Sequence, residues 1–207
     1  MAMGHVILRE FHLDRQAEYF EDYARKYTDM PMLVRLERRG DRLVPGRLLR
    51  ASDFEGGLGE TANTEWKTVA LDRRSGEILV PQGSAGFRWG DAGRWNLEPR
   101  DGRGREIEPV MTLLAGPLHD EVVEVGFPYF GNRKHDHFEG TDHADVLDRR
   151  VPARRVRLAD GEALVATVFD LLVANYGLDR GLGGANVARD YDLNEPYTPA
   201  WAERITG

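Results

Sequence analysis

The chain has 207 residues, of which 41% are hydrophobic and 30% are charged, as in ordinary folded domains. Acidic residues outnumber basic ones by 35 to 28, and the net charge is −7. This balance argues against a nucleic-acid-binding protein, which needs a basic face to neutralise phosphates, and against a polybasic membrane-surface patch. The absence of cysteine excludes disulfides, thiolate zinc sites and cysteine-ligated iron–sulfur clusters within these residues.

The sequence predicts neither a membrane span nor a signal peptide. The longest apolar stretches, such as Ala163 to Val168, are far shorter than the roughly 20 residues that cross a bilayer. Residues 1–8 lack a basic leader and a small-residue cleavage site.

Two helices are expected at the start of the chain. Apolar residues recur at helical spacing over residues 1–11, and Asp14 could cap a second helix that runs to about Tyr27. On that helix Tyr19, Tyr23 and Tyr27 share one face, and we expect them in the core rather than in a cofactor site.

Short strands and two further helices follow. The glycine- and tryptophan-rich residues 83–104 are expected to dock on a neighbouring surface, because tryptophans in a loop usually find a packing partner. The Asp-Gly pair at 160–161 predicts a tight hairpin turn, and Gly177 should end a helix over 169–176. A short helix should start at Thr198-Pro199, after a loop over 181–196. The expected strands are 32–36, 47–49, 67–71, 77–80, 120–125, 154–158 and 163–168.

No repeat or linker divides the chain, so residues 1–207 form a single segment. The expected helices and strands together predict a mixed α/β fold class with loop-rich insertions. The first helical pattern has no capping residue before it, and the last helix has room for barely two turns. These ends predict an internal piece cut from a longer protein. A natural short terminal helix is the alternative.

The strongest candidate for a metal site is a polar cluster in which imidazoles and carboxylates crowd into about ten residues. The alternative, which we favour, is a solvated loop, because metal ligands usually come from separate elements. The cluster comprises His135, Asp136, His137, Glu139, Asp142, His143 and Asp145.

Other motifs are weaker. The glycine clusters 56–59 and 181–184 lack the preceding strand and following helix of a dinucleotide fingerprint, so we interpret them as turns. The run Gly83-Ser84-Ala85-Gly86 resembles a nucleophile elbow, but Gln82 stands where its first glycine should be. The residues therefore predict no catalytic residue and no metal ligand, and cofactor-binding positions stay open.

Several segments taken together resemble the catalytic alpha subunits of bacterial membrane-bound respiratory nitrate reductases, within the molybdopterin oxidoreductases. The resemblance runs from end to end of the chain. It is carried by residues 25–34, 86–90 with 94–98, 124–131, 172–182 and 197–203.

The resemblance implies a multidomain enzyme that reduces nitrate to nitrite at molybdenum bis(molybdopterin guanine dinucleotide). In that family a His and three Cys hold a 4Fe-4S cluster and an aspartate holds molybdenum, all upstream of anything matching Met1. The implied partners are an iron–sulfur beta subunit and a haem-containing membrane gamma subunit, which hold the enzyme on the cytoplasmic side of the cell membrane.

Two alternatives stay open: a cofactor-free scaffold or binding module derived from the same family, and a small metal-dependent enzyme using His135, His137 and His143. If the chain is part of a larger subunit, four aromatic side chains should pack against its neighbouring parts. They are Trp89, Trp95, Tyr129 and Phe130.

Overall fold

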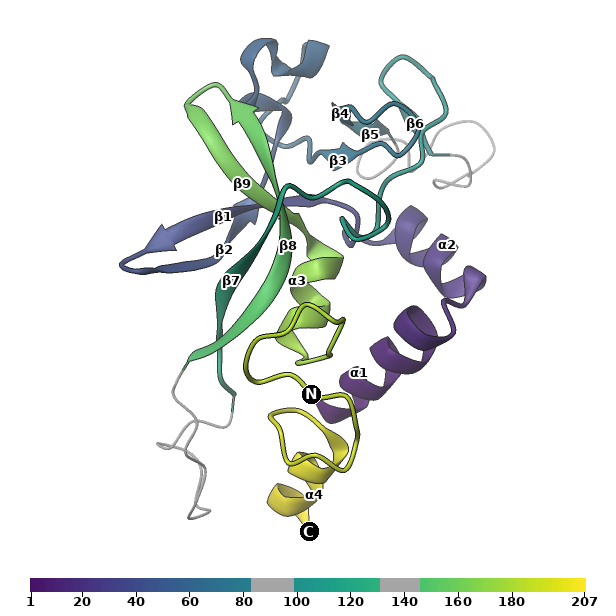
Figure 1. The fold of residues 1–207 in the computed structure, drawn as a ribbon. Coiled ribbons are helices and arrows are strands. Elements are labelled where there is room, and N and C mark those ends of the chain that lie inside the picture. The colour runs from purple at the N-terminus through teal and green to yellow at the C-terminus, as the bar shows by residue number, and fades with distance from the viewer. Residues whose placement is uncertain (83–98, 131–145) are drawn as a thin grey trace.

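The centre of the fold is a small β-barrel (Figure 1). The computed structural model describes residues 1–82, 99–130 and 146–207. In these residues five strands close in the order β1-β2-β7-β8-β9. Neighbouring strands are antiparallel except β2 and β7, which meet in parallel at the pair Leu43 and Val125. The strands are β1 Leu33–Arg39, β2 Arg42–Leu48, β7 Glu121–Pro128, β8 Val146–Leu158 and β9 Gly161–Thr167.

The predicted hairpin is confirmed as β8 and β9. Leu158 pairs with Gly161, so Ala159 and Asp160 form the turn, and Gly161 has a φ of 129° that glycine adopts without strain. Strand β8 begins well before the predicted position 154, because alternating charged residues hide its first half from a hydrophobic pattern.

Alternating side chains separate two hydrophobic clusters across the barrel wall. One cluster draws on all five strands and on α3, Val168–Asn175, and includes Val34, Val125 and Val151. The other lies on the opposite side of the strands, where Leu33 packs with the short 3₁₀ helices η2, Ala51–Asp53, and η3, Glu55–Gly59. Adjacent strand residues point to opposite faces, which explains why Leu33 and Val34 belong to different clusters.

Two further sheets of two strands each lie beside the barrel. The predicted pairing of 67–71 with 77–80 is confirmed, although the strands are shorter than expected. The other sheet joins the residues on either side of 83–98. The strands are β3 Ala70–Leu71, β4 Ile78–Leu79, β5 Pro81–Gln82 and β6 Arg100–Asp101. With its helices and mixed sheet, the chain has the expected mixed α/β character.

The first helix runs further than predicted. Helix α1, Ala2–Ile7, continues directly into a π-helix, η1, Leu8–Asp14, so Asp14 ends one helix instead of capping the next. Gln16, with a φ of 47°, breaks the chain direction, and α2, Glu18–Tyr27, starts without a side-chain cap. The prediction of Asp14 as a cap was therefore wrong. Among the described residues, no helix is both long and apolar enough to cross a membrane.

Helix α4, Pro199–Thr206, starts as predicted, since the Thr198 hydroxyl accepts a hydrogen bond from the Trp201 N–H at 3.1 Å. It packs against α1 (Figure 1). Trp201 also donates to the Tyr129 hydroxyl. Tyr129 is thus buried inside this chain, which contradicts the expectation that it packs outward, whereas Phe130 is 65% exposed.

The tyrosine stripe on α2 is not in the core of this chain. Tyr19, Tyr23 and Tyr27 are 73%, 50% and 39% exposed, so the expectation of burial was wrong. The reason is the direction of the helix face: Ala24 is the residue that α2 buries.

Candidate functional site

Three regions that the sequence singled out lie outside the described residues. These are the histidine and carboxylate cluster at 135–145, the motif at 83–86, and the tryptophans Trp89 and Trp95. In residues 1–82, 99–130 and 146–207, no three His, Cys, Asp or Glu side chains lie together in a way that could hold a metal ion.

The glycine clusters have the positive φ that was predicted for them, the first within η3 and the second in a loop. Gly56, Gly57 and Gly59 have φ values of 68°, 58° and 81°, and Leu58 between them shares this left-handed conformation at 57°. Gly181, Gly183 and Gly184 likewise have positive φ. Glycine is favoured here because it enters this region without a steric penalty.

A groove of about 590 Å³ lies between η1, the start of α3 and the loop 111–115. Its charged lining includes the carboxylates Asp14, Glu21 and Asp179 and the guanidinium groups Arg73 and Arg180. Two of these carboxylates are already paired, Glu21 with Arg25 and Asp179 with Arg189, so the count of charges in the lining does not select the charge of a ligand.

Arg180, one of the residues that line this groove, belongs to a buried ion pair. Asp170 on α3 is 1% exposed and pairs with Arg180 from the loop that follows the helix. Its Oδ1 accepts from the Thr112 hydroxyl at 2.6 Å, and its Oδ2 accepts from the Leu113 N–H at 2.9 Å. The Thr167 hydroxyl lies 2.9 Å from the same Oδ2. The arrangement ties the loop 111–115 to the first turn of α3.

Three donors hold the Asp170 carboxylate: the Thr112 hydroxyl and Arg180 on Oδ1, and the Leu113 N–H on Oδ2. The single proton of the Thr167 hydroxyl is shared between the same Oδ2 and the Met111 carbonyl, each at 2.9 Å. A buried carboxylate enclosed by donors in this way is a structural tie between the loop 111–115, Arg180 and the first turn of α3. The sequence did contain a signal for this site. Thr167 and Asp170 have the spacing of a helix capping motif, and Thr167 accepts the Asp170 N–H at 3.0 Å.

His12 lies at the edge of the groove, with its ring 5.8 Å from that of Phe169. Burial lowers the pKa of His12 below its ordinary value, although the nearby carboxylate of Glu21 opposes this shift. The imidazole is therefore neutral at pH 7. No nucleophile lies within hydrogen-bonding distance of it in the described structure, so it lacks the partner that a catalytic base needs.

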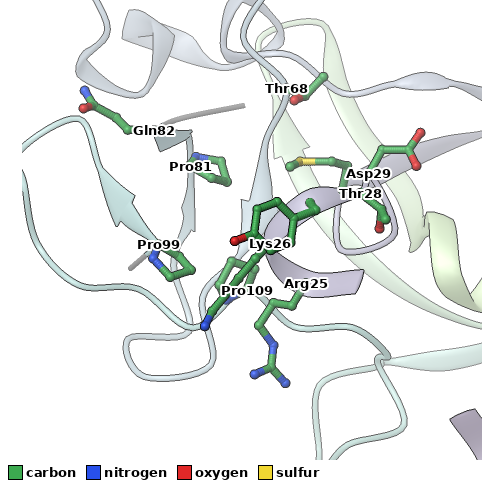
Figure 2. A pocket seen from close by; sticks show the side chains of 11 residues that line it. Arg25, Lys26, Thr28, Asp29, Thr68, Pro81, Gln82, Pro99 and Pro109 are labelled. Atoms are coloured by element: carbon green, nitrogen blue, oxygen red, sulfur yellow. The ribbon is translucent and has the colours of Figure 1, made fainter. Parts of the chain in front are cut away.

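A second pocket, of about 220 Å³, lies beside the end of α2 (Figure 2). Pro81 and Pro99 lie across it from Thr28 and Asp29. The two cations at its edge are both paired along the helix, one turn apart: Arg25 with Glu21 at 2.7 Å, and Lys26 with Asp22 at 2.8 Å. Neutralised in this way, they do not form an anion site.

Arg149 is the most deeply buried cation of the described chain, at 0% exposure. Its Nε donates to the Asn186 carbonyl at 2.9 Å and its Nη1 to the Ala174 carbonyl at 2.8 Å, while its guanidinium lies over the Tyr197 ring. Burial lowers the pKa of Arg149 to about 10, so it stays charged at neutral pH. The carbonyls at the negative end of α3 stabilise this charge. Nothing in the sequence pattern singled it out.

The buried polar groups are thus structural ties, and the two hollows have no reacting group poised over them. Comparison with known proteins then supplies what the geometry does not. No family model matches the chain. It is 55% identical over 209 aligned residues to the respiratory nitrate reductase 1 alpha chain of Escherichia coli strain K12, and 54% identical to the respiratory nitrate reductase 2 alpha chain of that strain. It is 40% identical to the nitrate reductase alpha chain of Bacillus subtilis strain 168.

Each of these alignments covers 100% of this chain but only 16% of the relative. The expected resemblance is therefore confirmed over the whole sequence: the chain belongs to the respiratory nitrate reductase alpha chains, and corresponds to a segment of them.

Proposed function

We propose that these residues are part of the catalytic alpha subunit of a respiratory nitrate reductase, which reduces nitrate to nitrite. The observation that carries this proposal is the 55% identity to a respiratory nitrate reductase alpha chain across the entire sequence. The parent complex would use molybdenum bis(molybdopterin guanine dinucleotide) and a 4Fe-4S cluster. An iron–sulfur beta subunit and a haem-containing gamma subunit would hold it on the cytoplasmic side of the membrane.

The residues present here do not fit as ligands for those metal centres. The chain has no cysteine for an iron–sulfur cluster, and its described part has no group of three metal-ligating side chains. The buried carboxylate of Asp170 already accepts hydrogen bonds from Thr112, Leu113 and Arg180. The ligands of the metal and the cluster would therefore come from other parts of the subunit.

The role proposed for this segment is that of a scaffold. A closed barrel removes open strand edges, and the buried pairs around Asp170 and Arg149 fix the loops and α3 against it. A rigid body of this kind supports a cofactor bound elsewhere, because the cofactor carries the hard chemistry and the protein holds it in place.

The test is to express the complete gene that encodes this segment, together with its partner subunits, in anaerobic cells. Nitrate-dependent oxidation of reduced methyl viologen and the nitrite formed would be measured, with metal content determined on the same sample. Molybdenum together with nitrite formation is expected. A molybdenum-loaded protein that forms no nitrite would contradict the proposal.

The cofactor-free module remains the alternative function, and the same gene distinguishes it. Stop codons directly outside the codons for residues 1 and 207, with a purified product that contains no molybdenum, would favour the module. An open reading frame that continues on both sides would exclude it.

A further inference from the structure

The exposed aromatic face of α2 is the feature that the scaffold role leaves unexplained. Tyr19, Tyr23 and Tyr27 recur every four residues and therefore lie on one side of the helix. Phe20, which is 38% exposed, lies beside them. We call these four residues the α2 aromatic face. A contiguous aromatic surface of this kind on a soluble protein usually marks a contact.

The rings of this face are already ordered against each other. Tyr19 and Tyr23 stack with centroids 6.3 Å apart, and Tyr23 and Tyr27 lie 5.0 Å apart. Phe20 meets Tyr19 edge to face at 5.6 Å. Rings that are held in place lose little conformational entropy on contact, so a preformed ladder of tyrosines is well suited to an interface.

Four charged residues of the same helix are paired with one another. Glu21 pairs with Arg25, and Asp22 pairs with Lys26, each one turn along α2. The helix therefore presents an aromatic centre bordered by neutralised ion pairs, which is the usual anatomy of a protein interface. A strongly charged partner would gain little here, whereas an apolar surface with hydrogen-bond acceptors for the tyrosine hydroxyls would fit.

The occupant follows from length. The whole chain aligns with its relatives but covers only 16% of their length. A parent subunit as long as these relatives therefore has most of its polypeptide outside this structure. We infer that the α2 aromatic face is an intramolecular interface, covered in the parent subunit by another segment of the same polypeptide that presents apolar groups and hydrogen-bond acceptors. This inference rests on the proposed function, because it needs the longer subunit.

The first experiment is hydroxyl-radical footprinting of the complete alpha subunit, isolated and in complex with its partner subunits. The oxidation rates of Tyr19 and Tyr23 are each divided by the rate in the denatured subunit. Tyr197, which is 0% exposed here, provides the rate of a buried ring. We expect the relative oxidation rates of Tyr19 and Tyr23 in the isolated subunit to be as low as that of Tyr197. Rates close to the denatured ones, or protection that appears only in the complex, would overturn the inference.

A variant pair gives an independent readout in the same complete subunit. Tyr23→Gln keeps a good helix former but removes the ring, while Glu18→Gln makes a matched change at an exposed position of the same helix. We expect Tyr23→Gln to lower the midpoint of thermal inactivation and Glu18→Gln to leave it unchanged. Equal midpoints for the two variants would overturn the inference.

Nitrite formation measured on each preparation separates the two proposals. Activity with exposed tyrosines refutes the interface alone, whereas a molybdenum-loaded subunit without activity refutes the proposed function.

Discussion

Replacing Asp170 by asparagine tests whether its buried pair with Arg180 fixes the loop 111–115. The carboxylate receives the Leu113 N–H on one oxygen and the Arg180 Nη1 on the other. An amide offers one oxygen instead of two. In either orientation of Asp170→Asn, its NH₂ group must therefore face an N–H donor, and the charge opposite Arg180 is lost.

The expected loss of stability in Asp170→Asn follows from the burial of the pair. The side chains of Asp170 and Arg180 are 0% and 9% exposed, so water cannot replace the lost partner. Breaking a buried pair costs about 3–5 kcal/mol, and the isosteric amide should lie at the low end, about 3 kcal/mol. This energy corresponds to roughly 150-fold more frequent local opening of the loop and of the first turn of α3.

The assay is hydrogen exchange of the complete alpha subunit, followed by mass spectrometry of peptides that contain Leu113 and the start of α3. A local measurement is needed because a large multidomain subunit does not unfold in two states. Asp192→Asn, at an exposed position of the loop before α4, is the matched control and should leave exchange unchanged. Unchanged exchange in Asp170→Asn would refute the reasoning that this pair holds the loop.

Three further outcomes are expected in the same exchange measurement. Gly177→Ala should loosen the end of α3 by roughly 1–3 kcal/mol, because its φ is 74° and a Cβ would lie 2.8 Å from Arg149 Nη2; wild-type exchange would refute this. Thr198→Val should speed exchange at Trp201 several-fold, since losing a cap costs about 1 kcal/mol; an unaltered α4 would speak against the cap. Burial lowers the pKa of His5 below its ordinary 6.5, so the protection of α1 should be complete above pH 6.5 and fall below it, as the unfolded state binds the proton first. Protection that stays constant down to pH 5, after correction for intrinsic rates, would contradict this.

Local signals in the sequence were sufficient where neighbouring residues decide the structure. The β8–β9 turn needs Gly161 at a φ of 129°, and α3 ends at a glycine whose φ is 74°. Thr198 caps α4 through its own side chain. Each of these features depends on residues a few positions apart, which a sequence displays directly.

Long-range closure was not accessible in the same way. The barrel is completed where β2 meets β7, at the pair Leu43 and Val125, and no local pattern reports a contact between residues so distant in the chain. Arg149 illustrates the same limit for the site. It stands in a strand of mixed charges, and only the folded position of α3 turns it into a buried cation held by carbonyls.

The error over Tyr19, Tyr23 and Tyr27 is of a different kind. Helical periodicity identifies which residues share a face and whether that face is apolar. It does not identify the body that covers the face, because burial depends on whatever packs there. In the described part of the chain, the tyrosines of this face are exposed, and Ala24 is the residue of α2 that is buried. This chain covers 16% of the length of its relative, so a parent subunit of that length has ample further polypeptide to cover the face. The same stripe is then consistent both with the exposure found here and with the burial that the sequence predicted, in a larger molecule.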